Sequence, residues 1–171
     1  MLFNSPQFIL FFIATVSLFY LTPHVLKWGV LILASAFFYY QWQPWFVLVL
    51  AGVVLSTWAI SLLMSRQDNL KVRKFYLAAS IFINLGLLLW FKYTNFAGNS
   101  VNLILKGPGL DYSFDPVNLM LPIGLSFYSL AAIGYSFDVY RENIKPERHL
   151  GHFALFMSFF PKHISGPIER G

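Results

Sequence analysis

Five long apolar runs, separated by short polar stretches, limit what this chain can fold into more than any other feature of its sequence. A helix that crosses the roughly 30 Å hydrocarbon core of a bilayer needs about 20 residues, within a range of roughly 17 to 25. The last three runs meet this length, whereas the first two must borrow flanking residues or lie where the bilayer is thin. The runs are Phe8–Leu21, Val25–Tyr40, Trp45–Met64, Phe75–Phe91 and Leu119–Phe137.

The composition favours a membrane protein over a soluble domain. The chain is 57% apolar and 11% charged, whereas soluble domains average about 45–50% and about 25%. Its basic residues, which give a net charge of +5, separate the apolar runs and therefore indicate topology rather than a nucleic-acid surface. The sequence has no cysteine, which excludes disulfides and thiolate chemistry within it. We therefore expect an all-α polytopic membrane protein with about five transmembrane helices.

The distribution of charge predicts the orientation. If the five spans cross the membrane in alternating directions, the loops on one side of the membrane carry eight basic residues and those on the other side carry only Lys92 and Lys106. The positive-inside rule places the eight in the cytoplasm and the N-terminus outside. The loop Arg66–Lys74 would then be cytoplasmic, either as a plain topogenic loop or in contact with anionic headgroups. The eight residues are Lys27, Arg66, Lys71, Arg73, Lys74, Arg141, Lys145 and Arg148.

Two shorter segments complete the expected organisation. Thr94–Lys106 holds too few apolar residues to span a bilayer, so it predicts an interfacial helix or a structured outer loop. Leu150–Phe160 would reach about 16 Å as a helix, roughly half the bilayer. Because Pro161 follows, this segment predicts a re-entrant or tilted helix that breaks at that proline.

The stretches Leu121–Arg141 and Phe159–Arg170 are apolar, yet they carry proline, glycine, serine, tyrosine and ionisable residues. In hydrocarbon an unpaired backbone group costs several kcal/mol, and a central Asp or Arg costs roughly 2.5 to 3.5 kcal/mol on insertion scales. Both stretches are therefore expected inside the protein, where they line a cavity, rather than against lipid.

These two stretches and several shorter motifs carry a family resemblance. In order along the whole chain they resemble the membrane-bound O-acyltransferases, in the bacterial branch of the alginate O-acetylases and the peptidoglycan and D-alanyl-teichoic-acid transferases. The matching motifs are Met1-Leu2-Phe3-Asn4-Ser5, Ala34-Ser35 with Phe38-Tyr39 and Trp42, Phe91-Lys92-Tyr93, Leu121–Tyr128 (LPIGLSFY), Asp138-Val139-Tyr140-Arg141, and Phe159-Phe160-Pro161 with Ser165–Arg170 (SGPIER).

The resemblance implies a bacterial inner-membrane enzyme that transfers an acyl group, usually acetyl, to a hydroxyl. The donor would be acetyl-CoA or an acyl carrier thioester on the cytoplasmic side, used as a substrate and not as a bound cofactor. The acceptor would be an envelope polysaccharide or a periplasmic or extracellular acyltransferase partner. The lipid bilayer would surround the protein, and no nucleic acid would be involved.

Members of this family are considerably longer than this chain, and the resemblance implies that their essential histidine lies beyond the position of Gly171. Residues 1–171 are therefore expected to be the N-terminal part of a single transmembrane domain, without a catalytic residue of their own. This part would supply scaffold and one wall of the substrate tunnel, and by itself it would be inactive.

Five residues are candidates for the substrate tunnel or for contact with the donor. Arg141 would either form an ion pair with Asp138, three residues earlier, or face the phosphates of a coenzyme or carrier arm. His163 follows the expected helix break, which it would cap or line. Glu169 and Arg170 at membrane depth would need to be paired or hydrated. The five candidates are Arg141, Lys162, His163, Glu169 and Arg170.

Other polar residues are expected to be structural. Ser126 and Tyr128 lie in the fifth run, with Asp138 at its end, and no base is near enough in sequence to activate a serine. His149 and His152 would share a helix face, but no third ligand is placed beside them, so no metal site is expected.

Two other functions remain open at this point. Broken helices at mid-membrane are also typical of transporters, so the chain could be half of a transporter or flippase, although it holds no inverted repeat. A non-catalytic membrane subunit would have the same composition. The sequence leaves open whether the chain is part of an enzyme.

Overall fold

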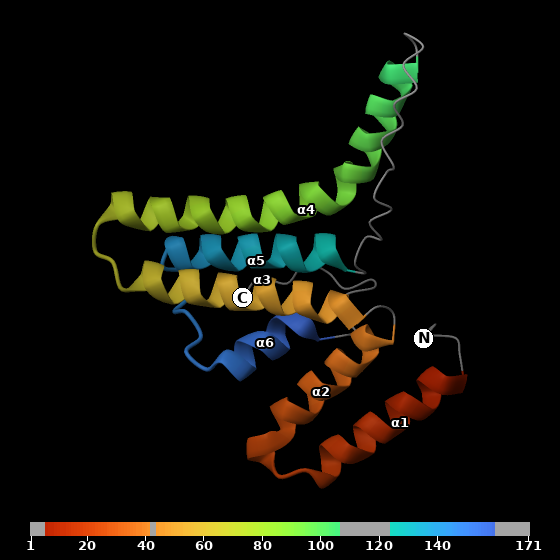
Figure 1. Cartoon of the computed structure of the whole chain (residues 1–171). Coiled ribbons are helices and arrows are strands. Elements are labelled where there is room, and N and C mark those ends of the chain that lie inside the picture. Colours follow the sequence, from red (N-terminus) through yellow and green to blue (C-terminus); the bar gives the residue numbers. More distant parts are fainter. Residues whose placement is uncertain (1–5, 42–43, 107–123, 160–171) are drawn as a thin grey trace.

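The computed structural model describes residues 6–41, 44–106 and 124–159, of which 95–106 are described by their backbone alone. Every regular element in these residues is helical, as the sequence predicts. In chain order the elements are α1 (Pro6–Leu21), the short 3₁₀ helix η1 (His24–Leu26), α2 (Lys27–Tyr40), α3 (Pro44–Ser65), α4 (Leu70–Lys106), α5 (Leu125–Tyr140) and α6 (Leu150–Ser158), as Figure 1 shows.

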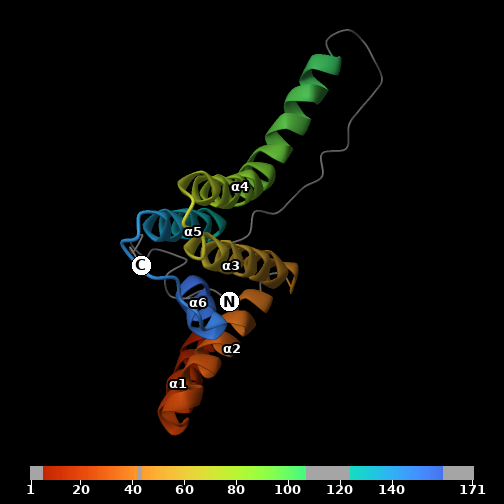
Figure 2. The same ribbon diagram turned by 90° about the vertical axis from the view of Figure 1, so that its left-hand side faces the viewer.

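Helices α3, α4 and α5 lie side by side and form the centre of the structure (Figure 1). The buried apolar side chains between them include Val53, Leu77 and Tyr128. Helix α6 packs against α2 and α3, and α1 contacts α2 on the outside (Figures 1 and 2). The described chain is thus a helix bundle with the α1–α2 hairpin on one side.

Two helices are long and apolar enough to cross a bilayer, judged by length and composition alone. They are α3 and the part Leu70–Thr94 of α4. At 1.5 Å per residue, the 22 residues of α3 extend about 33 Å, which matches a hydrocarbon core of about 30 Å. The helix Pro6–Leu21 and the stretch His24–Tyr40 are apolar but shorter. Within the described residues the structure therefore supplies two candidate spans, where the sequence predicts about five.

Helix α4 is longer than the sequence predicts. Instead of beginning at the expected run Phe75–Phe91, the helix begins after Asn69, whose Oδ1 accepts a hydrogen bond from the backbone N–H of Lys71 at 2.9 Å. It then includes Thr94–Lys106, so this segment is a direct continuation of α4 and not a separate helix or loop. No proline lies within 70–106 to end the helix where the apolar run ends. Figure 1 shows the second half of α4 leaving the bundle.

The other boundaries differ less from the expected ones. The run Val25–Tyr40 is divided into η1 and α2. Helix α5 begins after Gly124, whose φ of 77° lies in the left-handed region that glycine adopts easily. The expected start of the fifth run, at Leu119, lies outside the described residues. Helix α6 occupies the predicted Leu150–Phe160 segment and lies obliquely to α3 (Figure 1), whereas the predicted break at Pro161 is also outside the described residues.

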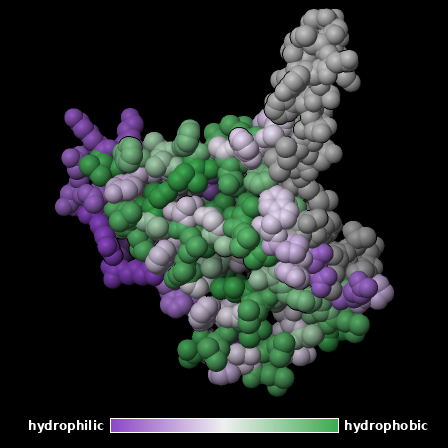
Figure 3. All heavy atoms as spheres, in the orientation of Figure 1, coloured by the Kyte–Doolittle hydropathy of each residue, from purple (hydrophilic) through white to green (hydrophobic). Residues whose placement is uncertain are grey.

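The surface of the bundle is largely apolar, and its interior holds several buried polar side chains beside the apolar core. Large side chains such as Leu10, Leu48 and Phe82 are 69%, 74% and 78% exposed, whereas Ser80 and Asn84 are completely buried. On the face that Figure 3 shows, apolar residues cover most of the molecule, and the largest group of hydrophilic residues lies at its left-hand end, with a smaller group at the lower right. Soluble monomers rarely expose contiguous apolar surface on this scale. This distribution supports a protein whose sides face lipid.

Candidate functional site

A column of small polar side chains runs through the centre of the bundle, between α3, α4 and α5. The hydroxyl oxygens of Ser80 and Ser136 lie 2.7 Å apart and share a hydrogen bond between α4 and α5. One turn further along α4, Asn84 Nδ2 donates to Thr57 Oγ1 of α3 at 3.3 Å. All four side chains are buried. Such interhelical hydrogen bonds contribute only about 0.6 kcal/mol each in membranes. Their main effect is therefore to fix the register of the helices, and they add little to the stability of the bundle.

This polar column contains no catalytic pair. The hydroxyls of Ser61 and Ser129 and the amide oxygen of Asn84 have no hydrogen-bond partner within the described residues. A serine nucleophile needs a base within hydrogen-bond reach. In the described part of the chain no histidine and no carboxylate is buried, so these hydroxyls lack a base.

Two of the three residues of α5 that the sequence marks as structural, Ser126 and Tyr128, occupy different environments. Tyr128 is buried in the core that α5 shares with α2 and α3, where Tyr39 and Leu50 are also buried. Ser126 is only half-buried. Ser136, further along the same helix, makes a side-chain hydrogen bond that joins α5 to α4.

Arg73 is the only charged side chain that is buried in the described part of the chain. Its guanidinium donates hydrogen bonds to the carbonyl oxygens of Tyr140 at 2.6 Å and Val139 at 3.4 Å, and it forms an ion pair with Glu142. The last carbonyls of a helix have no partner within it, so Arg73 of α4 caps the C-terminus of α5. Glu142, which has a φ of 62°, follows directly in the loop that leads to α6.

The α5–α6 loop is held on two further sides. Trp58 Nε1 of α3 donates to the carbonyl oxygen of Glu147 at 2.9 Å, and the backbone N–H of Glu147 donates to Tyr135 Oη of α5 at 2.8 Å. The Glu147 carboxylate accepts a hydrogen bond from the backbone N–H of His149 at 2.8 Å. Three helices therefore fix the position of the loop, and with it the start of α6.

The basic stretches of the chain meet at one end of the bundle. The start of α4 contacts the α5–α6 loop through Arg73 and Glu142, and the start of α2 contacts it through Trp28, whose ring lies 5.1 Å from that of His149. Figure 3 shows the hydrophilic side chains gathered at the end that holds the α3–α4 turn and the α5–α6 loop. The predicted positive side of the chain is therefore a single surface in the structure.

The predicted ion pair between Asp138 and Arg141 does not form. Asp138 Oδ1 instead accepts a hydrogen bond from Asn143 Nδ2 at 3.2 Å, and the Arg141 guanidinium lies 4.4 Å from the centre of the Phe137 ring. Arg141 is the C-cap of α5, and its backbone N–H still bonds the carbonyl oxygen of Phe137, so the two side chains differ in their partners and not in their helical register. Its exposed guanidinium remains at the basic end.

His149 and His152 form the N-terminal cap of α6. The Nδ1 atom of His149 accepts the backbone N–H of His152 at 3.3 Å, which caps the N-terminus of α6. Among the residues that the structure describes, no three histidine, aspartate or glutamate side chains are grouped so that they could hold a metal ion. Next to the cap, a Cβ placed on Gly151 would lie 2.5 Å from the Trp28 ring, so glycine permits the close approach of α6 to α2.

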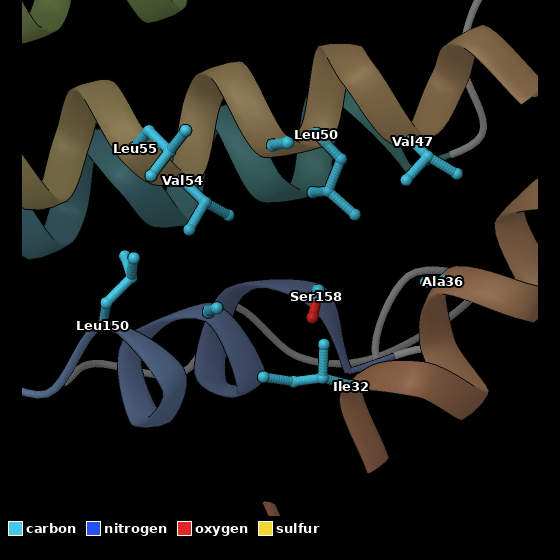
Figure 4. Close-up of a pocket in the computed structure, with 10 residues that line it drawn as sticks. Ile32, Ala36, Val47, Leu50, Val54, Leu55, Leu150 and Ser158 are labelled. Atoms are coloured by element: carbon cyan, nitrogen blue, oxygen red, sulfur yellow. The ribbon is translucent and has the colours of Figure 1, made fainter. Parts of the chain in front are cut away.

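An apolar cleft of about 220 Å³ lies between α2, α3 and α6 (Figure 4). Its lining includes Ile32 of α2, Leu50 of α3 and Leu150 of α6. Ser158 of α6 also lines the cleft, and its hydroxyl has no hydrogen-bond partner within the described residues. Chemically, this cleft suits a hydrocarbon group and excludes a charged one.

Four of the five predicted tunnel residues lie outside the described residues, namely Lys162, His163, Glu169 and Arg170. Of the five, only Arg141 can be placed. The capping role of Arg73 was not predicted from the sequence, in which this residue counts among the topogenic cations. A signal was present, because Arg73, Leu77, Ser80 and Asn84 follow one another at intervals of three or four residues and share the buried face of α4.

The chain is similar in sequence to several bacterial O-acetyltransferases. The chain is 35% identical to a probable alginate O-acetylase of Pseudomonas putida, over 99% of this chain and 35% of that protein. The corresponding protein of Pseudomonas aeruginosa is 33% identical, over 99% of this chain and 33% of its own length. A peptidoglycan O-acetyltransferase of Helicobacter pylori is 31% identical, over 98% of this chain and 37% of its own length.

The chain therefore spans about a third of the length of these curated relatives. No family model matches it, and no solved structure matches it either. The three relatives share an O-acetylating activity by name and align along nearly all of this chain. With an all-helical bundle and an apolar surface, the chain belongs to the membrane-bound O-acyltransferases, in the branch of the alginate O-acetylases.

Proposed function

We propose that this chain is part of an enzyme that transfers an acetyl or related acyl group to a hydroxyl of an envelope polysaccharide. The observation that carries the proposal is the alignment of 98–99% of the chain with alginate O-acetylases and a peptidoglycan O-acetyltransferase. The relatives are named for two acceptors, alginate and peptidoglycan. We therefore propose an envelope polysaccharide as the class of acceptor, without choosing between the two.

The structure supports a scaffolding role for the described residues. Helices α3 to α5 form a bundle that is held in register by buried hydrogen bonds, and no base is buried near their hydroxyls. The chemistry would therefore require groups that the described residues do not contain. We propose that the bundle lies in the bacterial inner membrane with about five spans, and that its basic end faces the cytoplasm.

The acyl donor would reach the protein from that basic end. Acetyl-CoA and acyl carrier arms both carry phosphate, and Arg141 presents an exposed guanidinium there. A planar guanidinium binds phosphate through two parallel hydrogen bonds. We assign Arg141 as a donor contact, and we keep Lys162, His163, Glu169 and Arg170 as proposed tunnel residues.

The proposal is tested with the complete gene product that contains this sequence. Membranes from cells with and without that gene receive acetyl-CoA labelled in its acetyl group, and alkali-labile label is measured in the purified envelope polysaccharide. We expect label only when the gene is present. Arg141→Gln should raise the KM for the donor severalfold and change kcat little, because it weakens binding of the phosphates away from the reacting atoms.

Arg148→Gln is the matched control, because Arg148 is an exposed arginine of the neighbouring loop. It should leave the KM unchanged. Equal labelling of the polysaccharide in membranes that lack the gene would contradict the proposed function. Movement of unmodified polysaccharide across the membrane, without label transfer, would indicate a transporter.

A further inference from the structure

A polar pocket of about 410 Å³ opens at the basic end of the bundle. One wall is the α3–α4 turn, with Gln67 and Asp68, and the other is the α5–α6 loop, with Glu142 and Lys145. Arg73 of α4 also lines it. The volume lies within the range of roughly 300–1,000 Å³ that is usual for small-ligand sites, and the polar lining sets the pocket apart from the apolar cleft of Figure 4.

Among the described residues that line it, the pocket offers one free cation and one free carboxylate. Arg73 and Glu142 form an ion pair with each other, so they present no net charge to a ligand. Asp68 and Lys145 are exposed, and within the described part of the chain neither side chain has an ion pair or a hydrogen bond. A ligand that satisfies both must therefore carry a negative and a positive group.

The position of the pocket suggests where such a ligand comes from. Its lining includes Ser65, the last residue of α3, and Val139, near the end of α5. The pocket thus lies where the helices end, and the face of the bundle beyond it that Figure 3 shows is largely apolar, with exposed side chains such as Leu48 and Phe82. A bilayer that covers those sides places its headgroup layer at this level, where pockets between helices take lipid headgroups.

We propose that the pocket binds the headgroup of a phosphatidylethanolamine-type lipid, with its phosphate at Lys145 and its primary ammonium at Asp68. Phosphatidylglycerol has no cation to offer Asp68. Phosphatidylcholine has a cation whose methyl groups leave no N–H to donate, so it cannot form the charge-assisted hydrogen bond that a carboxylate accepts. The inference rests on the proposed membrane placement and does not depend on acyl transfer.

The test uses the complete protein, purified in mild detergent and mixed with equal amounts of phosphatidylethanolamine, phosphatidylglycerol and phosphatidylcholine. Native mass spectrometry counts the lipid that remains bound. The wild type should retain phosphatidylethanolamine in preference to the other two lipids. Lys145→Gln and Asp68→Asn should each lower its retention about fivefold, since one charge contact near a membrane surface has about that effect.

Two matched variants control for surface charge. Arg148→Gln and Asp138→Asn change a cation and a carboxylate that do not line the pocket, and both should retain phosphatidylethanolamine like the wild type. The proposal is overturned if the controls lose as much lipid as the pocket variants. It is also overturned if the three lipids bind equally, or if Asp68→Asn has no effect, which would indicate a simple anion site. Thermal unfolding of each variant checks that the fold is intact.

Discussion

At Gly151 a single added methyl group is expected to lower the stability of the fold. In Gly151→Ala the new Cβ would meet two carbon atoms of the Trp28 ring at 2.5 and 2.7 Å, and His149 Cε1 at 3.0 Å. The indole cannot move aside without losing its contacts with the α6 cap. We expect a loss of about 1–3 kcal/mol in the free energy of unfolding, measured as a lower Tm in detergent.

Gly134 provides the control for this substitution. It lies inside α5, and a Cβ there meets nothing within 4 Å. Gly134→Ala should keep or raise the Tm, because alanine is favoured over glycine in a helix by about 0.5–1 kcal/mol. A similar fall in both variants would show that the contact between α6 and Trp28 is not what glycine protects.

Arg73 and Glu142 form one ion pair but should contribute unequally to stability. The Arg73 side chain is 9% exposed and also bonds two carbonyls, whereas that of Glu142 is 72% exposed. Arg73→Gln should cost about 1.5–3 kcal/mol, and Glu142→Gln less than about 1 kcal/mol because solvent screens the pair. Chemical unfolding in one detergent measures both. Equal costs would mean that the ion pair, and not the helix cap, holds α5.

Single residues were also where reasoning from spacing failed. Asp138 and Arg141 have the spacing of a helical pair, but Asp138 accepts a hydrogen bond from Asn143 and the Arg141 guanidinium lies over the Phe137 ring. The end of a helix depends on contacts from elsewhere in the chain. Here the contact is Arg73, from another helix.

At the scale of elements, the α5–α6 loop depends on two hydrogen bonds from neighbouring helices. Trp58→Phe removes the N–H that bonds the carbonyl of Glu147, and Tyr135→Phe removes the hydroxyl that accepts from its backbone N–H. Each should weaken the loop by about 1 kcal/mol. Amide hydrogen exchange should therefore become faster in residues 141–149 and stay unchanged in α3.

Trp45→Phe is the matched control, because Trp45 stacks on Phe91 with ring centres 5.4 Å apart, far along α3 from the loop. Its substitution should leave exchange in 141–149 unchanged. If all three variants speed exchange there equally, the loop is not held by the two hydrogen bonds.

The presence of the helices could be predicted from the sequence, but the extent of α4 could not. Each helix of the structure overlaps a segment that the sequence predicts to be helical. The start of the fifth apolar run lies outside the described residues. A drop in hydropathy after Phe91 indicates the end of a membrane span and not the end of a helix. A proline is a strong sequence signal for the end of a helix, and 92–106 contain none.

At the scale of the whole molecule, the shared side of the basic residues was predictable and the polar column was not. Alternation of helices is enough to bring the starts of α2 and α4 and the α5–α6 loop to one end. The pairing of Asn84 with Thr57, and of Ser80 with Ser136, depends on the register of three helices. Hydropathy carries no information about that register.

The central claim is that the bundle lies across a membrane with its basic end in the cytoplasm. Residues 1–171 contain no cysteine, so Asp68→Cys and Gln41→Cys each place a single thiol in them, at the two ends of α3. In spheroplasts a membrane-impermeant maleimide should label Gln41→Cys directly, and Asp68→Cys only after permeabilisation. The reverse pattern would contradict the orientation, and labelling of both thiols in intact spheroplasts would contradict the membrane span.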